Sequence, residues 1–165
     1  MSQQVTINSS LSKEEKYKSL IPQIESLVEG ESDLIANIAN IVSALKYGLD
    51  SFFWVGVYFR KEDDLILGPF QGPVACTRMT IPNGVCGECA AKKDTIIVPD
   101  VNVHPGHIAC SADSKSEIVT PIFSGDEVSA ELDVDSDSLA NFDEIDKKYL
   151  QKVSELISRL ISSSN

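Results

Sequence analysis

The chain has 165 residues, 42% of them apolar, a size and composition that suit one folded domain with a hydrophobic core. Its formal net charge of −11 would repel nucleic-acid phosphates and anionic membrane surfaces, so we expect neither nucleic acid nor a membrane as a partner. The sequence has no apolar run long enough to cross a membrane and no signal-peptide pattern after Met1, which leads us to expect a cytoplasmic protein.

Two helices are expected first. Ser12 and Glu15 have the spacing of a capping box, in which each side chain bonds a backbone amide of the other residue. The helix that they start should run to about Val28, with a kink or restart at Pro22, which has no backbone N–H. A second apolar stripe with helical spacing predicts a helix over residues 32–48.

Strand patterns follow the second helix. Residues 52–60 and 65–67 are rich in aromatic and β-branched side chains and flank a charged turn, which predicts a hairpin. The glycines and prolines of residues 68–73 should end its second strand. The later chain predicts strands at 75–81, 95–98, 117–123 and 127–135, a short helix from Val85, a long loop at 101–115 and a final helix capped by Asp143.

This order of elements predicts an α/β fold of the α+β type. Helices should pack on one face of a central antiparallel sheet and leave the other face for a ligand pocket under loops. Residues 1–11 are polar and are expected to form a disordered tail, so that residues 12–163 make up a single domain.

The first predicted strand presents two aromatic side chains on one face. Because side chains alternate across a strand, Trp54 and Tyr58 should share a face, with Gly56 leaving space between them. The opposite, core face should carry Phe53, Val55, Val57 and Phe59. Trp54 and Tyr58 either line a small-molecule pocket or fill the core, and the strand pattern alone leaves both interpretations open.

Three carboxylates alternate in the same way on the last predicted strand. Glu131, Asp133 and Asp135 should lie on one face, and acidic residues in such a stripe usually meet water. Inside a pocket they would instead bind an ammonium group or, with a raised pKa, protonate a leaving oxygen.

Cys76, Cys86, Cys89 and Cys110 fall within a 35-residue segment. In a reducing compartment, clustered cysteines indicate metal binding or redox catalysis more often than structural disulfides. Zinc ligation by Cys86, Cys89, His107 and Cys110 would lack a typical paired spacing, so we expect no metal. Thiol redox chemistry accounts for more of the set, because an attacking thiolate needs a second thiol to form a disulfide. The positive form of His107 would favour a thiolate at Cys110.

An ordered series of short motifs runs from Glu31 to the final helix. The motifs are Trp54-Val55-Gly56-Val57-Tyr58, Leu67-Gly68-Pro69-Phe70-Gln71-Gly72, Gly84-Val85-Cys86-Gly87, Val98-Pro99-Asp100-Val101, Pro105-Gly106-His107-Ile108-Ala109-Cys110, Ser116-Glu117-Ile118-Val119 and Leu132-Asp133-Val134-Asp135-Ser136. In this order they resemble the free methionine-(R)-sulfoxide reductases, which are single GAF domains. The resemblance implies an oxidoreductase that reduces free L-methionine-(R)-sulfoxide to L-methionine.

The resemblance also implies roles for three cysteines. Cys110 would attack the sulfoxide sulfur and take the oxygen as a sulfenic acid, and either Cys76 or Cys86 would resolve it to a disulfide. Thioredoxin would reduce that disulfide, with no bound cofactor, and the protein would be a homodimer.

The substrate site follows from the same resemblance. Glu117, Asp133 and Asp135 match the acidic residues that hold the substrate amino group and assist protonation of the sulfoxide oxygen. Trp54 and Tyr58 match the aromatic wall around the substrate side chain.

The chain departs from the family pattern near two of these motifs. The family usually has small hydroxyl or apolar residues at Glu88 and Cys89, a Gly-Val pair at Ala130-Glu131, and often an acidic residue at Ser111. Cys89 would allow a disulfide with Cys86 that diverts the oxidising equivalent. A GAF module that only binds a small ligand, or a redox sensor that only forms a disulfide, is the alternative function.

Overall fold

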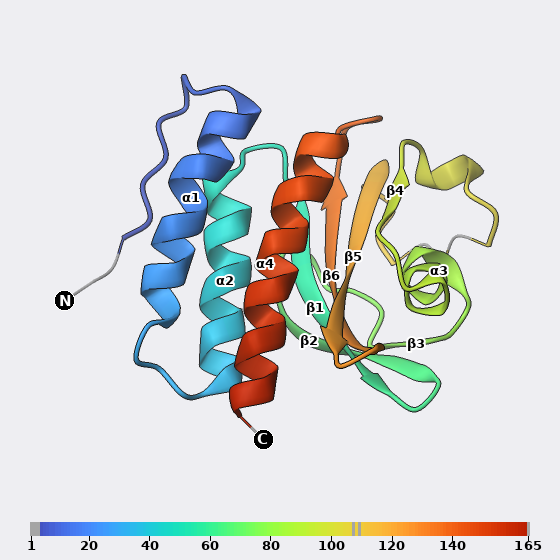
Figure 1. Cartoon of the computed structure of the whole chain (residues 1–165). Coiled ribbons are helices and arrows are strands. Elements are labelled where there is room, and N and C mark those ends of the chain that lie inside the picture. The colour runs from blue at the N-terminus through green and yellow to red at the C-terminus, as the bar shows by residue number, and fades with distance from the viewer. Residues whose placement is uncertain (1–3, 107, 109, 165) are drawn as a thin grey trace.

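The structure is a computed structural model that describes residues 4–106, 108 and 110–164 (Figure 1). Its helices are α1 (Lys13–Val28), α2 (Leu34–Gly48), α3 (Gly84–Lys92) and α4 (Glu144–Ser163), with a 3₁₀ helix at Val101–Val103. Its strands are β1 (Trp54–Lys61), β2 (Asp64–Gln71), β3 (Arg78–Thr80), β4 (Ile96–Val98), β5 (Ser116–Ser124) and β6 (Glu127–Ser136). None of the described helices combines the length and hydropathy of a membrane-spanning segment.

The strands form one antiparallel sheet in the order β3-β2-β1-β6-β5-β4. Helices α1, α2 and α4 form a layer against one face, while α3 packs on the opposite face (Figure 1). The predicted α+β class is confirmed. Helix α3 and the loops beside it enclose the second face, where the pocket was expected.

Each face of the sheet has its own hydrophobic cluster. Val55 and Val57 belong to the larger cluster under α1, α2 and α4, and Trp54 and Tyr58 belong to the smaller cluster beside α3. The predicted alternation along β1 is therefore confirmed. The prediction for Phe53 is wrong, because this residue packs on the smaller cluster. Phe53 precedes β1, so it lies outside the extended backbone in which successive side chains point to opposite faces.

Strand β2 continues to Gln71, although its glycine and proline residues were expected to end it. The register with β1 shifts between Gly56 and Tyr58, opposite Gly68 and Pro69. A bulge of this kind tolerates proline, since the neighbouring β3 pairs only with the first residues of β2. A Cβ atom on Gly68 would lie 2.5 Å from the Phe59 ring, which explains glycine there.

Capping boxes start both α1 and α4. The Ser12 amide donates to Glu15 Oε2 at 2.9 Å and the Glu15 amide donates to Ser12 Oγ at 3.4 Å, as predicted. Asp143 and Asp146 form the same reciprocal pair at α4. Helix α1 continues through Pro22, so this residue does not restart it.

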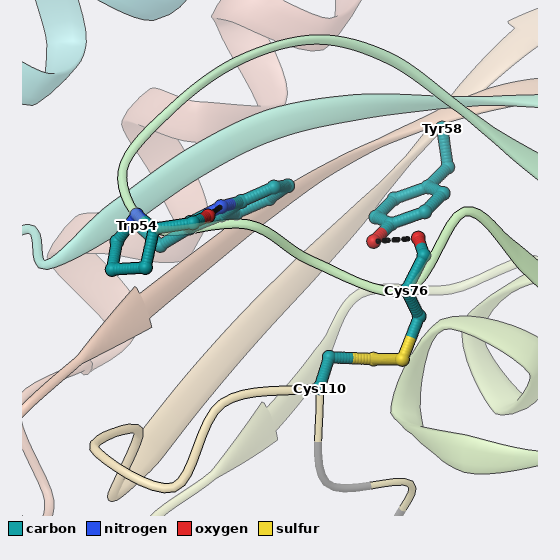
Figure 2. The surroundings of a disulfide bond; sticks show 5 residues. Trp54, Tyr58, Cys76 and Cys110 are labelled. Atoms are coloured by element: carbon teal, nitrogen blue, oxygen red, sulfur yellow. Dashed lines mark hydrogen bonds between the residues drawn. A yellow bond between two sulfur atoms is a disulfide. The ribbon is translucent and has the colours of Figure 1, made fainter.

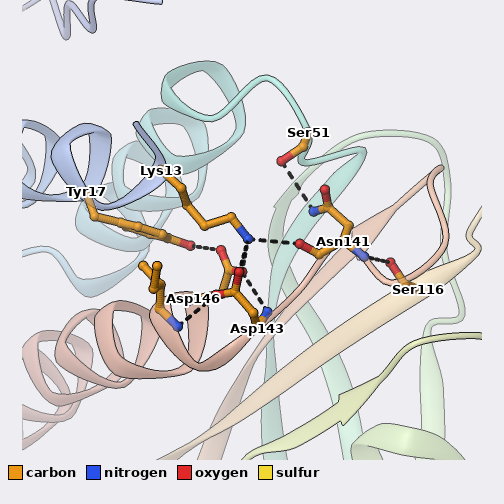
Figure 3. Close-up of polar contacts among 8 residues, drawn as sticks. Lys13, Tyr17, Ser51, Ser116, Asn141, Asp143 and Asp146 are labelled. Atoms are coloured by element: carbon orange, nitrogen blue, oxygen red, sulfur yellow. Dashed lines mark hydrogen bonds and ion pairs between the residues drawn. The ribbon is translucent and has the colours of Figure 1, made fainter. Parts of the chain in front are cut away.

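Polar contacts join the starts of these two helices (Figure 3). Lys13 Nζ donates to Asp146 Oδ2 at 2.5 Å and to Asp143 Oδ2 at 2.9 Å, and the Tyr17 hydroxyl donates to Asp146 Oδ1 at 2.8 Å. Burial and the Asp146 charge raise the pKa of Tyr17, which keeps its hydroxyl a donor. The network fixes α1 against α4 on the side of the sheet away from the pocket.

Part of the segment whose composition predicts a disordered tail has contacts in the structure. The Thr6 amide donates to Gln23 Oε1 at 3.0 Å, and the Gln23 side chain donates back to the Thr6 carbonyl at 3.1 Å. Val5 and Ile7 pack against the larger cluster. The described residues 4–11 therefore lie along α1, held by two apolar side chains in an otherwise polar segment.

Candidate active site

A pocket with an empty volume of about 490 Å³, its open mouth included, lies on the face of the sheet beside α3. It is lined by Trp54, Tyr58, Val74, Ala75, Met79, Gly84, Val85, Cys86, Ile108, Cys110, Ser111, Ser114, Glu117, Asp133 and Asp135. Seven of the eight site residues expected from the sequence are in this lining. The eighth, Cys76, is covalently attached to it through Cys110.

Aromatic rings form one wall of the pocket. The ring centroids of Trp54 and Tyr58 are 6.1 Å apart. The Phe70 ring stacks on Trp54 with a centroid distance of 5.4 Å. Gly56 makes the arrangement possible, because a Cβ atom there would lie 2.2 Å from the indole. Phe70 is outside the pocket lining and supports Trp54. The sequence reasoning missed this contact, since the strand that carries Phe70 was expected to end before it.

Hydrogen bonds hold the two pocket aromatics to the loop that follows β2. Trp54 Nε1 donates to the Pro73 carbonyl at 3.0 Å, and the Tyr58 hydroxyl donates to the Cys76 carbonyl at 3.0 Å (Figure 2). The aromatic wall therefore also positions the backbone that carries Cys76.

Cys76 and Cys110 form a disulfide with a Cα–Cα distance of 5.2 Å (Figure 2). The bond joins the loop after β2 to the loop before β5, two segments that are 34 residues apart in sequence. The sequence left Cys76 and Cys86 as equal candidates for pairing with Cys110, and in this structure the partner is Cys76. Because the Cys110 sulfur is bonded to carbon and sulfur, it is not free to ligate zinc in this state. His107 lies outside the described residues.

Cys86 and Cys89 are free, buried thiols on α3. Burial, followed by the nearby charges of Asp133, Glu131 and Glu117, raises the pKa of Cys86 well above its usual range. Only Cys86 of the two reaches the pocket lining.

Glycine places the start of α3 against the preceding loop. A Cβ atom on Gly87 would lie 2.6 Å from the carbonyl carbon of Pro82. The close approach fixes the turn of helix that carries both thiols.

Three carboxyl groups lie on the pocket face of the two central strands. Glu117 on β5 pairs directly with Asp135 on β6, and Asp133 is the next residue of β6 on that face. Glu117 and Asp133 are each only 6% exposed, so the interpretation that places this stripe in water is wrong. The hydrophobic cover supplied by α3 and the loops is a tertiary feature that strand alternation does not encode.

Burial is the main cause of the raised pKa values of these three carboxyl groups. It raises the pKa of both Glu117 and Asp133 well above the normal range. The charges of Asp133 and Asp135 further raise the pKa of Glu117, and those of Asp135 and Glu131 further raise the pKa of Asp133. Burial raises the pKa of Asp135 to about 6, against a smaller opposing effect of Ser114. Asp133 Oδ1 is buried and has no hydrogen-bond partner among the described residues. Such a site favours a bound cation or a retained proton.

The carboxylates and a thiol converge on one point. One side-chain atom from each of Cys86, Glu117 and Asp133 lies within 4.8 Å of the others. A primary ammonium group has three donors, so it suits this spacing and charge.

The loop that carries Cys110 is attached to α3. His104 Nε2 lies 2.9 Å from Glu88 Oε2, and Glu88 Oε1 accepts from Lys92 at 2.6 Å. Sequence reasoning missed this contact, because nothing in the spacing of Glu88 and His104 indicates that they meet.

Comparisons with known proteins agree with this site. A family model described as "GAF domain" matches residues 29–162. GAF domain-containing protein A of Dictyostelium discoideum is 54% identical over 88% of this chain and 92% of that protein. The free methionine-R-sulfoxide reductase of Saccharomyces cerevisiae is 41% identical over 94% of this chain and 91% of that protein. The free methionine-R-sulfoxide reductase of Neisseria meningitidis, solved with its substrate, superposes with a TM-score of 0.93 at 44% identity over 98% of both chains. The chain therefore belongs to the free methionine-R-sulfoxide reductases, a group of GAF-domain proteins.

Proposed function

We propose that this protein reduces free L-methionine-(R)-sulfoxide to L-methionine with its own thiols. The observation that carries the proposal is a cysteine pair, Cys76 and Cys110, at a pocket with buried carboxyl groups and an aromatic wall. Reducing a sulfoxide requires a soft nucleophile for sulfur, an acid for the leaving oxygen and a site closed to water. Cys110, once reduced, supplies the nucleophile, and the buried carboxyl groups supply the acid.

The substrate ammonium group binds to Glu117, Asp133 and Asp135, which need a positive partner or a proton. The substrate side chain then lies along Trp54 and Tyr58, whose apolar faces suit a thioether carbon chain. This orientation brings the sulfoxide toward Cys110 at the pocket mouth. The complex of the Neisseria meningitidis relative with its substrate supports binding of an amino acid in this fold.

The first chemical step forms a sulfenic acid. The Cys110 thiolate attacks the sulfoxide sulfur while a protonated carboxyl, Glu117 or Asp133, donates to the oxygen. The oxygen passes to Cys110 as a sulfenic acid, and the substrate sulfur leaves as the thioether of methionine. The raised pKa values of these carboxyls keep a proton available near neutral pH.

Cys76 then resolves the sulfenic acid. Its thiol attacks the Cys110 sulfur, water leaves and the observed disulfide forms. Cys86 is the poorer candidate because its burial and acidic neighbours disfavour a thiolate. Cys76 is only partly buried.

Thioredoxin is the proposed reductant of the Cys76–Cys110 disulfide, because both of its cysteines are partly exposed at the surface of the domain. A homodimer, a cytoplasmic location and a single domain over residues 12–163 are proposed on the family resemblance. Light scattering of the purified chain tests the dimer, and reduction by thioredoxin with its reductase tests the partner.

The decisive experiment supplies the reduced protein with dithiothreitol and the separate R and S epimers of free methionine sulfoxide. Methionine release is followed by chromatography. Turnover of the R epimer alone is expected. If a folded, fully reduced protein turned over neither epimer, the function would be that of a ligand-binding or redox-sensing GAF module instead.

A further inference from the structure

A buried carboxyl group lies behind the pocket with no role in the mechanism above. Glu131 on β6 is 0% exposed, and neither of its carboxyl oxygens has a hydrogen-bond partner among the described residues. Burial raises its pKa to about 8, and the adjacent thiols of Cys89 and Cys86 offset part of the shift. An unpaired carboxyl at such a position costs stability, so its presence between two thiols points to a chemical role.

The two thiols beside Glu131 are placed to react with each other. Cys86 and Cys89 are three residues apart on α3, so they lie on the same side of the helix with Cα atoms about 5 Å apart. Disulfides span Cα distances of roughly 4.4–6.8 Å. The Cys89 thiol donates to the Val119 carbonyl at 3.7 Å, a weak contact that a side-chain rotation would release.

Cys86 also borders the same pocket as the Cys76–Cys110 disulfide. Cys86 and Cys110 line the same pocket, so the Cys86 sulfur faces the space onto which the Cys76–Cys110 bond opens. Cys89 lies one turn further along α3 and is fully buried. Cys86 therefore borders the pocket, whereas Cys89 and Glu131 lie outside its lining.

We propose that Cys86 and Cys89 form a second redox couple, with Glu131 as its proton acceptor. The couple passes its one electron pair to the Cys76–Cys110 disulfide and so restores the catalytic thiol once before an external reductant is needed. The inference rests on the proposed function, because the first disulfide is the product of that reaction.

The transfer proceeds through two thiol–disulfide exchanges. The ionised form of Glu131 takes the Cys86 proton, and the Cys86 thiolate attacks the Cys110 sulfur while Cys76 leaves as a thiolate that takes up this proton. Glu131, ionised again, takes the Cys89 proton, and the Cys89 thiolate attacks the Cys86 sulfur. Cys110 leaves as a thiolate that takes up the second proton, and a Cys86–Cys89 disulfide closes. The second pair loses two electrons and two protons, and the first pair gains two of each.

A buried acceptor makes these steps feasible. Desolvation raises the pKa of both thiols, so an attacking thiolate forms only if a nearby base takes the proton. Glu131 is in contact with both, and it is shielded from water like the thiols themselves. A base with a pKa near the working pH is the most effective for such a transfer.

The proposal predicts the number of turnovers that the chain completes alone. The full chain is reduced with dithiothreitol, freed of it without oxygen, and mixed with excess methionine-(R)-sulfoxide. Two methionines per chain are expected for the unaltered protein. Cys89→Ala should stop at one, whereas Ala91→Ser, an exposed change on the same helix, should still give two.

Glu131→Gln gives a second, independent variant. It keeps the side-chain volume and both thiols but removes the proton acceptor. The first methionine should appear at the normal rate and the second about tenfold more slowly or worse. Equal rates for both methionines would overturn the role of Glu131.

Mass spectrometry identifies the bond directly. Trypsin releases residues 79–92 as one peptide that contains both Cys86 and Cys89. After the second turnover this peptide should be two hydrogens lighter and resist alkylation. One methionine per chain, with both cysteines still alkylated, would overturn the proposal and leave the reductase function intact. No methionine at all would overturn the reductase function and, with it, this inference.

Discussion

Glu117 on β5 lies directly opposite Asp135 on β6, and both side chains line the pocket. Directly paired residues on antiparallel strands have Cβ atoms about 5 Å apart, so two full negative charges repel strongly when they are also desolvated. Burial, followed by the charges of Asp133 and Asp135 on Glu117 and of Asp135 on Asp133, keeps a proton on this group at neutral pH. The sheet register therefore brings together two of the buried carboxyls to which we assign the proton-donating group.

Asp133 should be the most sensitive carboxyl group to substitution. Its Oδ1 atom lacks a partner in the described structure, so a substrate ammonium or the sulfoxide oxygen would supply one. Asp133→Asn removes both the charge and the acid, and we expect kcat/KM to fall about 100-fold. Steady-state kinetics with dithiothreitol measures this.

Asp137→Asn is the matched control, since Asp137 follows on the same chain segment but is exposed. It should change kcat/KM by less than about twofold. Equal kinetics for the Asp133 variant and the unaltered protein would return this carboxylate to a structural role.

Substitutions of the two disulfide cysteines should have different effects in single-turnover experiments with enzyme in excess over substrate. Cys110→Ser should abolish methionine formation because the nucleophile is lost. The Cys76→Ser variant should form methionine at the normal rate. The return of Cys110 to its thiol form should be slower, since the Cys110 sulfenic acid then lacks the thiol with which it pairs. Rapid-quench chromatography gives the first rate. Similar loss in both variants would contradict these separate roles.

Local side-chain geometry explains what the sequence could predict of the site. Trp54, Tyr58 and the carboxyls of β6 were assigned to one face because alternation depends only on an extended backbone. The capping box of Ser12 and Glu15 is equally local, since both partners lie within one turn.

Contacts between distant segments were beyond such reasoning. The choice of Cys76 as partner of Cys110 depends on how two loops meet across the pocket. Phe70 stacks on Trp54 because β2 continues past Pro69 through a bulge. The burial of Glu131 depends on α3, which packs on the face that the sequence left open.

Gly56→Ala should disturb the aromatic wall. The added methyl group would lie 2.2 Å from the Trp54 ring and 2.8 Å from Phe70, so the indole must move. We expect a rise in KM for the sulfoxide and a shift in fluorescence, which reports on Trp54 because the chain has one tryptophan. A Gly56→Ala, Trp54→Leu double variant should regain the stability, but not the KM, of the unaltered protein. Unchanged fluorescence in the single variant would contradict the crowding.

Lys13→Met should destabilise the α1–α4 junction. Asp146 is 1% exposed, so removing Lys13 leaves a buried carboxylate with only Tyr17 and its own capping contact. We expect a loss of about 2–3 kcal/mol in the free energy of unfolding, measured with urea at neutral pH. Lys18→Met is the control, because its 3.5 Å contact with Glu14 is exposed and should contribute under about 0.5 kcal/mol. Equal effects of both variants would show that burial of Asp146 does not matter.

Glu131 should make the folded protein less stable as the pH rises. Its pKa is raised to about 8 by burial, above the ordinary value of 4.5, so the folded state binds its proton more tightly than the unfolded state. The free energy of unfolding contributed by this proton is fully present below pH 4.5 and is lost as the pH rises toward 8.

Glu131→Gln removes this dependence. The comparison is made on the disulfide-bonded form of both proteins. The variant minus the unaltered protein gives a difference in the free energy of unfolding at each pH. This difference should be larger at pH 8 than at pH 5, in favour of the variant, by on the order of 2–4 kcal/mol. Urea unfolding at both pH values, with the Cys76–Cys110 bond intact, measures the two differences. If the two proteins lost stability in parallel between pH 5 and pH 8, Glu131 would already be ionised in the folded state. It would then be too weak a base to take the proton of a neighbouring thiol.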